Sequence, residues 1–396
     1  MMKKTLLCLT LAGFLSACGG SDNDSSDDHP SPNPPATTTQ TGVLTDGPVS
    51  GVKYIRSSST DSIEGMTNDD GEFQYIEGEE IRFFIGDVQL GEVVEAKERI
   101  TPLDLAETPE ARTNLMVFLQ SLDDHGDHSD GIQITEDTRT AFTAVNLDFN
   151  QSFTDFSNEI VSKMGIPQDQ LITPEEAASN FQATFYKDIA GSWELDRGET
   201  NAIVLHILPD GRYAIGEAYP SDETGFTGIE FGSLNWDSVT TGLNPSIMTD
   251  TNGDYGLSHP DENGQYRLNY NGKDLVVTET RSDGVANFTR IEQSTGLVGT
   301  WALNETHLFA FFESGHYFLL DLQGDNDCAT PGIEYGKYST TANTLAVTAN
   351  LFDTNGCGGL HDSTNGNMIN ATYSISGTSL TLHPQGEDPV TFQRSK

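Results

Sequence analysis

The chain has 396 residues, of which 60 are Asp or Glu and 20 are Lys or Arg, so its formal net charge is −40 at pH 7. Such a surface repels nucleic acid and anionic lipid headgroups, and we expect no nucleic-acid partner. The length is too great for one small core, so several folded segments are expected. Solubility in a salty habitat explains the charge most simply. Divalent cation binding at local carboxylate clusters is a second explanation.

The first residues have the pattern of an export signal. Two lysines precede an apolar run from Thr5 to Leu15, and Ser16-Ala17-Cys18 follows. A basic start, an apolar stretch and small residues before the cut are typical of a secretory signal. The run is too short for a bilayer core about 30 Å thick. We therefore predict that residues 1–17 are a signal peptide.

The sequence LSAC, which ends at Cys18, resembles the lipobox of bacterial lipoproteins. The resemblance implies that the Cys18 thiol takes lipid and that the mature chain begins there, anchored to a membrane. Gly19 in the next position favours the outer membrane and leaves the periplasmic or surface side open. The alternative is a soluble secreted protein with a cysteine at this position. Residues 18–41 have no large apolar side chain and predict a disordered tether.

Two cysteines remain once Cys8 leaves with the signal and Cys18 takes lipid. In an oxidising compartment, Cys328 and Cys357 predict a disulfide. A bridge that closes a loop of this size stabilises a protein by about 3 kcal/mol.

Residues 42–104 alternate apolar and polar side chains between Gly and Asp turns, which predicts short antiparallel strands. GVLTDGPVSGVKY followed by TNDDGEFQY resembles the small β-sandwich modules of the carboxypeptidase regulatory or collagen-adhesin B-repeat type. The resemblance implies a β-sandwich module, and such modules serve mostly as spacers.

The hydrophobic period changes over residues 105–188, which predict a small helical subdomain. Residues 107–123 place apolar side chains three and four apart, with Pro109 near the start. Residues 173–189 offer Thr173 as the N-cap and Pro174 as the first helical residue. Residues 135–147 and 156–165 predict shorter helices.

The chain repeats itself after residue 189. GSW at 191–193 corresponds to GTW at 299–301, GIEFG at 228–232 corresponds to GIEYG at 332–336, and FTR at 288–290 corresponds to FQR at 392–394. DGRY and SGHY, and DTNGDYGL and DTNGCGGL, fall between them in the same order. The separation stays near about 104 residues, so we predict a duplication, with copies at 189–295 and 296–396.

Each copy carries about eight short strand patterns joined by tight turns, as in a small up-and-down barrel. G-x-W on the first strand and Arg on the last resemble the lipocalin-like (calycin) barrels. The resemblance implies that Arg290 crosses Trp193, and Arg394 crosses Trp301, at the barrel base. The expected fold is therefore mainly β with a helical insert: a β-sandwich, a small helical subdomain, then two duplicated up-and-down β-barrels.

Two strand patterns, Ala202–Leu208 and Leu308–Phe312, are apolar on both faces. A barrel strand with one face in water alternates instead. We expect these strands to pack against each other across the two copies. A patch exposed to a ligand is the alternative.

Two acidic loops are candidate calcium sites. Asp250, Asn252 and Asp254 have the spacing of the front half of an EF-hand-type loop, and the alternative is an Asx-turn. The second copy has Cys357 in place of the third carboxylate. The other loop carries Asp123, Asp127 and Asp130, whose charges would repel without a cation. Its His125 and His128 raise zinc as an alternative.

Glu230 and Glu334 recur in the GIEFG and GIEYG segments, where a structural role is expected because each belongs to a separate copy. Paired carboxylates for acid–base chemistry are the alternative. The sequence has no nucleophile elbow, zinc-protease motif or phosphate-binding glycine loop, so we expect no enzyme. The expected function is non-catalytic binding of an apolar or amphipathic molecule by a lipid-anchored envelope protein. The alternative is an adhesin-like or structural lipoprotein that contacts a surface polymer.

Overall fold

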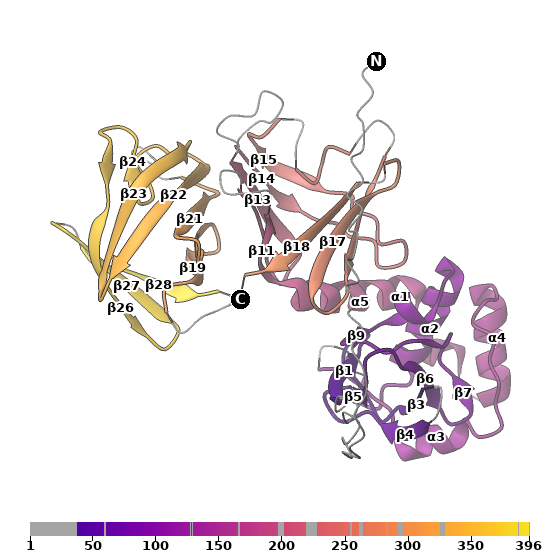
Figure 1. The fold of residues 1–396 in the computed structure, drawn as a ribbon. Coiled ribbons are helices and arrows are strands. Elements are labelled where there is room, and N and C mark those ends of the chain that lie inside the picture. The colour runs from indigo at the N-terminus through magenta and orange to yellow at the C-terminus, as the bar shows by residue number, and fades with distance from the viewer. Residues whose placement is uncertain are drawn as a thin grey trace, which may run out of the picture. The chain divides into compact units, whose positions relative to one another are not determined.

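The computed structural model describes residues 38–58, 61–126, 128, 130–164, 167–196, 202–218, 228–253, 256–260, 264–282, 284–291, 296–324, 329–386 and 388–395. The signal peptide, Cys18, most of the tether, Asp127, Asp254 and Cys328 lie outside these residues. The fold is mainly β with a helical insert (Figure 1). Within the described residues, no helix combines the length and apolar character needed to cross a bilayer.

The N-terminal module, which comprises β1–β10 and α1–α4, begins with two small sheets. One has the order β5 (Glu72–Tyr75), β1 (Gln40–Leu44), β9 (Arg99–Ile100). The other has the order β4 (Ser62–Met66), β3 (Lys53–Ser57), β6 (Glu80–Ile85), β7 (Val88–Gln89), with β8 (Val94–Glu95) also on β6. A third pair joins β2 (Val49–Ser50) to β10 (Ile132–Gln133).

The strand pairing in this module differs from the expectation in one respect. The pairs β1–β9 and β2–β10 are parallel, so the prediction of antiparallel strands is wrong for them. Each pair joins segments far apart in the chain, which a tight hairpin turn cannot connect. The hairpin-like pairs, such as β3–β4, are antiparallel as expected.

The four predicted helices form, and α5 has the predicted cap at Thr173. They are α2 (Pro109–Ser121), α3 (Glu136–Ala141), α4 (Phe153–Met164) and α5 (Pro174–Ile189). The short helix α1 (Pro102–Leu105) and the 3-10 turn η1 (Gln168–Gln170) were not predicted. Thr108 caps α2, and Thr173 with Glu176 forms a capping box on α5. The apolar side chains of α2 and α4 share one core with the sheets, which includes Phe83, Phe118 and Phe156. The helices α1–α4 and the β-sandwich are thus one packed module, with no break at residue 104.

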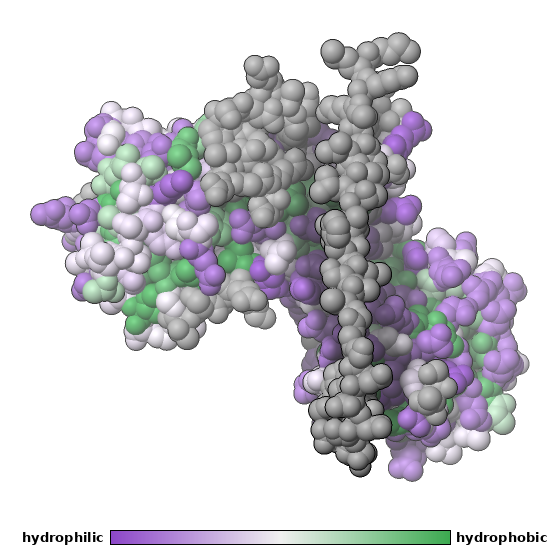
Figure 2. All heavy atoms as spheres, viewed as in Figure 1, coloured by the Kyte–Doolittle hydropathy of each residue, from purple (hydrophilic) through white to green (hydrophobic). Residues whose placement is uncertain are grey.

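On the face seen in Figure 2, hydrophilic residues cover much of the N-terminal module, and hydrophobic residues form small separate groups. Such a surface agrees with the high acidic content of the chain.

The second repeat is a closed barrel. Its strand order is β19 (Gly299–Asn304), β20 (His307–Phe311), β21 (His316–Asp321), β22 (Gly332–Thr341), β23 (Thr344–Asp353), β26 (Asn370–Ser376), β27 (Ser379–Pro384) and β28 (Val390–Arg394). It closes because β28 pairs back onto β19, with Trp301 opposite Arg394. A small hairpin, β24 (His361–Asp362) and β25 (Asn367–Met368), lies between β23 and β26 in the chain.

The first repeat is an eight-stranded sheet with the same order of strands, but one seam is open. Its strands are β11 (Gly191–Asp196), β12 (Ala202–Ile207), β13 (Arg212–Ala218), β14 (Gly228–Ser233), β15 (Ser246–Asp250), β16 (Tyr266–Tyr270), β17 (Asp274–Glu279) and β18 (Val285–Arg290). In the described part of the chain, no ladder joins β15 to β16. Residues 241–243 reach β16 instead, where Leu243 N donates to Tyr266 O at 2.8 Å.

Trp236 explains the open seam. It lies between β14 and β15, where the second repeat has a tight turn between two long strands. Its ring is fully buried and stacks on Phe185 of α5, with ring centroids 3.8 Å apart. Its Nε1 donates to Leu268 O at 2.9 Å, and its backbone N donates to the Tyr186 hydroxyl at 2.9 Å. The segment between β14 and β15, which carries Trp236, therefore packs against α5 instead of continuing the sheet edge.

The two repeats pack through the strands that are apolar on both faces, as predicted. One buried cluster combines Val204, Ala214, Ile229 and Phe231 of the first repeat with Leu308, Ala310, Phe312, Phe318, Leu320, Ile333 and Tyr335 of the second. The contact is close, since a Cβ added at Gly216 would lie 2.5 Å from both Phe318 and Leu320.

Each tryptophan meets the arginine that the calycin resemblance assigned to it. Arg290 Cζ lies 4.1 Å from the centre of the Trp193 ring, and Arg394 Cζ lies 4.0 Å from that of Trp301. Both indoles are fully buried. Arg290 also donates to the backbone oxygens of Ala190 at 2.6 Å and Asp188 at 2.9 Å. These contacts close the base of each repeat.

Candidate functional site: a cavity in the first repeat

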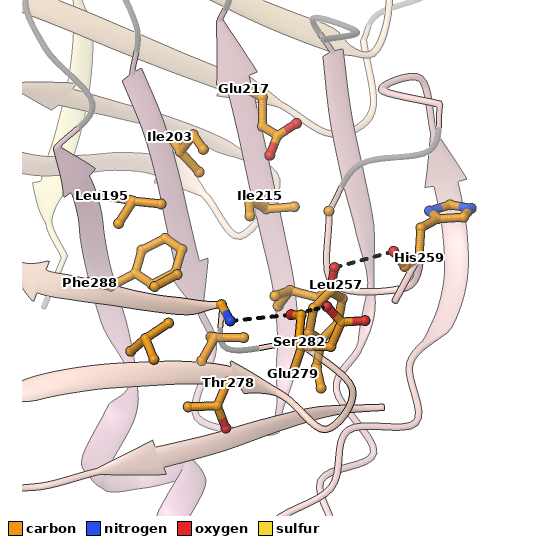
Figure 3. A pocket seen from close by; sticks show the side chains of 16 residues that line it. Leu195, Ile203, Ile215, Glu217, Leu257, His259, Thr278, Glu279, Ser282 and Phe288 are labelled. Atoms are coloured by element: carbon orange, nitrogen blue, oxygen red, sulfur yellow. Dashed lines mark hydrogen bonds between the residues drawn. The ribbon is translucent and has the colours of Figure 1, made fainter. Parts of the chain in front are cut away.

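A cavity of about 450 Å³ lies in the first repeat, at the end of the sheet away from Trp193 and Arg290. We call it the first-repeat cavity. Its apolar wall consists of Leu195, Ile203, Ile215, Val277 and Phe288. Figure 3 shows three of the aliphatic side chains and the Phe288 ring on neighbouring strands. A cavity of this size, in which an apolar wall meets several polar groups, is typical of small-molecule sites.

Polar groups surround the apolar wall (Figure 3). Glu217 follows Ile215 by two residues on β13, so the two side chains share one face of the sheet. Ser282 Oγ donates to Glu279 Oε2 at 2.6 Å, and the Tyr266 hydroxyl donates to His259 O at 3.2 Å. The described lining residues include neither Lys nor Arg. The charges that they bring to the cavity are therefore predominantly negative.

Toward its base, next to Trp301, the interior of the second repeat is filled by aromatic rings. Leu205 faces Trp193 across the first hairpin, and Phe309 holds the same position opposite Trp301. Ile207 likewise matches Phe311. The Phe309 and Phe311 ring centroids are 6.1 Å apart, and Phe309 meets Phe392 edge-on at 5.4 Å. Larger side chains at the positions of Leu205 and Ile207 thus occupy this part of the second repeat, and the first-repeat cavity begins one step farther along, at Ile203 and Ile215.

The open seam is a second difference between the two repeats. Gly256, Leu257 and His259 follow β15, Tyr266 begins β16, and all four line the first-repeat cavity. In the second repeat, β23 pairs with β26 at the equivalent edge. The open seam therefore gives the first-repeat cavity its side wall of loop residues.

A buried tyrosine–glutamate pair recurs in both copies. Tyr213 donates its hydroxyl to Glu230, and Tyr317 donates to Glu334. Leu257 N donates to Glu230 at 2.9 Å, and Leu360 N donates to Glu334 at 2.8 Å. Each carboxylate thereby ties the loop after the DTNG segment to the strand below it.

Burial controls the ionisation of this pair. Desolvation raises the pKa of Glu334 to about 8, against hydrogen bonds from Tyr317 and the Leu360 backbone that lower it. Burial, and next the charge of Glu334, raise the pKa of the Tyr317 hydroxyl. The same causes raise the pKa of Tyr213 beside Glu230. The two glutamates occupy separate interiors, which favours the structural role over acid–base chemistry.

The DTNG loops form Asx-turns in both copies. Asn252 N donates to Asp250 Oδ1 at 3.2 Å, and Asn355 N donates to Asp353 Oδ1 at 2.8 Å. Asn252 is fully buried and its Nδ2 faces Glu217, away from the turn. This geometry is the alternative that the sequence left open. Calcium at Asp250, Asn252 and Asp254 stays a prediction, with Asp254 outside the described residues.

The second acidic loop is held by a buried carboxylate. Asp123 Oδ1 accepts from Gln133 N at 2.9 Å, and its Oδ2 lies 3.7 Å from His128 Nδ1. Asp130 lines a separate hollow of about 120 Å³ together with His125. The structure therefore places Asp123 and Asp130 in different surroundings. Calcium and zinc binding here stay predictions, because Asp127 lies outside the described residues.

One further group has the make-up of a metal site. Glu230, Asp250 and His259 each offer a ligand atom, and these atoms lie within 4.8 Å of one another. Glu230, however, accepts hydrogen bonds from Tyr213, the Leu257 backbone and both the backbone and hydroxyl of Ser258. These donors use the lone pairs of a carboxylate, so a metal would have to displace them.

Sequence reasoning missed the tyrosine partners and His259. A signal existed, because each tyrosine precedes its glutamate by 17 residues in both copies. A spacing that survives duplication at a polar position indicates a pair in contact. Cys357 is disulfide-bonded. Its pairing with Cys328 stays a prediction, since Cys328 lies outside the described residues.

Comparison with known proteins gives no family. No protein-family model and no curated sequence matches the chain. Solved structures give weak likenesses to the DNA polymerase III β subunit of Thermotoga maritima, at 10% identity and a TM-score of 0.11, and to the Helicobacter pylori β clamp, at 9% and 0.12. The alignments cover 53% and 54% of this chain and 56% and 63% of those structures. Scores this low carry no argument about fold or function.

Proposed function

We propose that this protein is a lipid-anchored envelope protein that binds an apolar or amphipathic small molecule, without catalysis, in the first-repeat cavity. The observation that carries the proposal is the contrast between the two copies. Where the second repeat places Phe309 and Phe311, the first has Leu205 and Ile207, and a cavity of about 450 Å³ lies farther along the same interior. An apolar wall supplies affinity through burial of ligand surface, at roughly 25 cal/mol per Å².

The lipid anchor rests on the LSAC segment and the tether-like residues 18–41. A single acyl chain holds a protein weakly, and several hold it nearly irreversibly. We expect the Cys18→Ser variant to leave the membrane fraction and to lose metabolic labelling with palmitate. Retention of both would overturn the anchoring part of the proposal.

The binding part is tested with the neutral fluorescent probe N-phenyl-1-naphthylamine. Two matched variants add a ring at equivalent positions, because Ile215 and Leu319 hold the same register opposite Leu205 and Phe309. We expect Ile215→Phe to fill the cavity, abolish probe binding and leave the unfolding temperature unchanged or higher. Leu319→Phe should overpack a filled interior, at about 1–3 kcal/mol, and leave probe binding intact. Binding that survives Ile215→Phe would contradict the proposal.

A second function is favoured by the filled second repeat. Its interior packing of Phe309, Phe311, Tyr317 and Phe392 is that of a rigid structural unit. If both repeats act as spacers, the protein is an adhesin-like or structural lipoprotein. Absence of probe binding to the wild-type protein, at any concentration below probe aggregation, would favour this function.

A further inference from the structure

We propose that the second repeat positions the wall of the first-repeat cavity, so that ligand binding in the cavity and packing between the two repeats stabilise each other. This inference rests on the proposed function. It begins from β12 and β13, whose two faces have different neighbours. Ile203 and Ile215 line the cavity (Figure 3). The adjacent residues Val204 and Ala214 belong to the buried cluster that joins the two repeats.

The register of β12 and β13 keeps these two faces separate. Leu205 is opposite Ile215 on the inner face, and Val204 is opposite Gly216 on the outer face. Because successive side chains of a strand point to opposite faces of the sheet, one layer of backbone separates the cavity from the second repeat. A shift of this backbone would therefore change the cavity and the inter-repeat contact together.

Gly216 lets the second repeat approach that backbone directly. A Cβ added at Gly216 would lie 2.5 Å from the side chains of both Phe318 and Leu320, which belong to β21. These two buried side chains therefore occupy the space that a side chain of β13 would fill. Close-packed interiors have low compressibility and transmit strain. We infer that Phe318 and Leu320 limit how far β13 can move away from the cavity.

The second repeat supports only one side of the cavity. Val277 and Phe288 form part of the remaining apolar wall and pack within the interior of the first repeat. Among the described residues, the inter-repeat cluster includes none from β16 or β17. Loss of the Leu320 side chain should therefore widen the cavity on the side of β13, and a wider cavity makes fewer contacts with its ligand.

The test compares two neighbouring leucines of β21 in the full-length mature protein, with N-phenyl-1-naphthylamine as the probe. Leu320→Ala removes a contact with β13, whereas the matched control Leu319→Ala removes the same atoms from the interior of the second repeat. We expect Leu320→Ala to weaken probe binding by about tenfold, a usual size for coupling between two sites. The emission of the bound probe should also move to longer wavelength, because water enters the widened cavity. Leu319→Ala should change neither property, and the volume-conserving Leu320→Met should match the wild type in both.

The wild-type protein offers a second measurement that needs no variant. Because coupling between two sites is reciprocal, saturating probe should slow hydrogen exchange in β21 as well as in β12 and β13. Probe binding that leaves exchange in β21 unchanged would overturn this inference and leave the proposed function standing. Binding by Leu320→Ala that equals binding by the wild type or by Leu319→Ala would do the same. A wild-type protein that binds no probe would overturn both proposals.

Discussion

The base of the first repeat gives a prediction whose magnitude follows from the contacts. Arg290→Met keeps an apolar stem over Trp193 but removes the guanidinium. The lost cation–π contact, at 4.1 Å in a shielded place, is worth about 1–2 kcal/mol. The lost hydrogen bonds to Ala190 O and Asp188 O contribute about 1 kcal/mol each. We therefore expect the variant to lose roughly 3–4 kcal/mol of unfolding free energy, the sum of these contributions.

Arg394→Met is the matched variant in the second repeat. Its guanidinium makes the same contact with Trp301 at 4.0 Å and donates to Gly296 O at 2.7 Å and Val298 O at 3.2 Å. Asp188 and Ala190 lie at the end of α5, where a cation gains a further 0.3–1 kcal/mol, roughly, from the helix dipole. We expect Arg290→Met to cost more than Arg394→Met by about this amount.

Hydrogen exchange read by mass spectrometry is the suitable assay, because a chain with several packed units need not unfold in one step. Arg290→Met should speed exchange in β11 and β18 and leave β19 and β28 unchanged, and Arg394→Met should do the reverse. The reasoning is refuted if either substitution leaves exchange in its own repeat unaltered, or if both alter the two repeats equally.

Three other predictions concern the core and the interface. Because the folded pKa of Glu334 is about 8 and its ordinary value is 4.5, the folded state holds a proton that the unfolded chain releases. The free energy of unfolding should therefore fall as pH rises from about 4.5 to 8. In urea titrations at pH 5 and 8, Glu334→Gln should show a smaller fall in unfolding free energy than the wild type. An equal fall in the two proteins would contradict the assignment. Trp236→Ala should cost about 3–5 kcal/mol and speed exchange in α5, and protection of α5 as in wild type would refute the anchoring role. Gly216→Leu should lower the unfolding temperature by forcing Phe318 and Leu320 apart from β13, and an unchanged temperature would argue against the inter-repeat contact.

Much of the fold is predictable from the sequence because its signals are local or repeated. Pro109, and Thr173 with Pro174, mark helix starts with short-range chemistry, and the structure has helices that start there. The duplication shows which segments of the two copies correspond. The calycin resemblance, applied to each copy, therefore predicts that Trp193 pairs with Arg290 and that Trp301 pairs with Arg394. The apolar faces of Ala202–Leu208 and Leu308–Phe312 indicated the contact between the copies.

The remaining features depend on distant contacts that a single sequence does not encode locally. The parallel pairs β1–β9 and β2–β10 join segments that only the assembled module brings together. The open seam follows from Trp236, whose partner Phe185 lies on a helix far away in the chain. The sequence shows that Phe309 is larger than Leu205. Only the strand register of the structure shows that the two residues are equivalent, because it places each of them opposite a tryptophan.

A crystal structure with 10-bromodecan-1-ol, whose bromine is located by anomalous scattering, tests the central contrast between the copies most directly. We predict one bromine peak in the first repeat, beside Ile203, Ile215 and Phe288. The interior of the second repeat should hold the rings of Phe309 and Phe311 and no ligand. A peak inside the second repeat, or a first repeat whose own side chains close the cavity with no peak, would contradict the account.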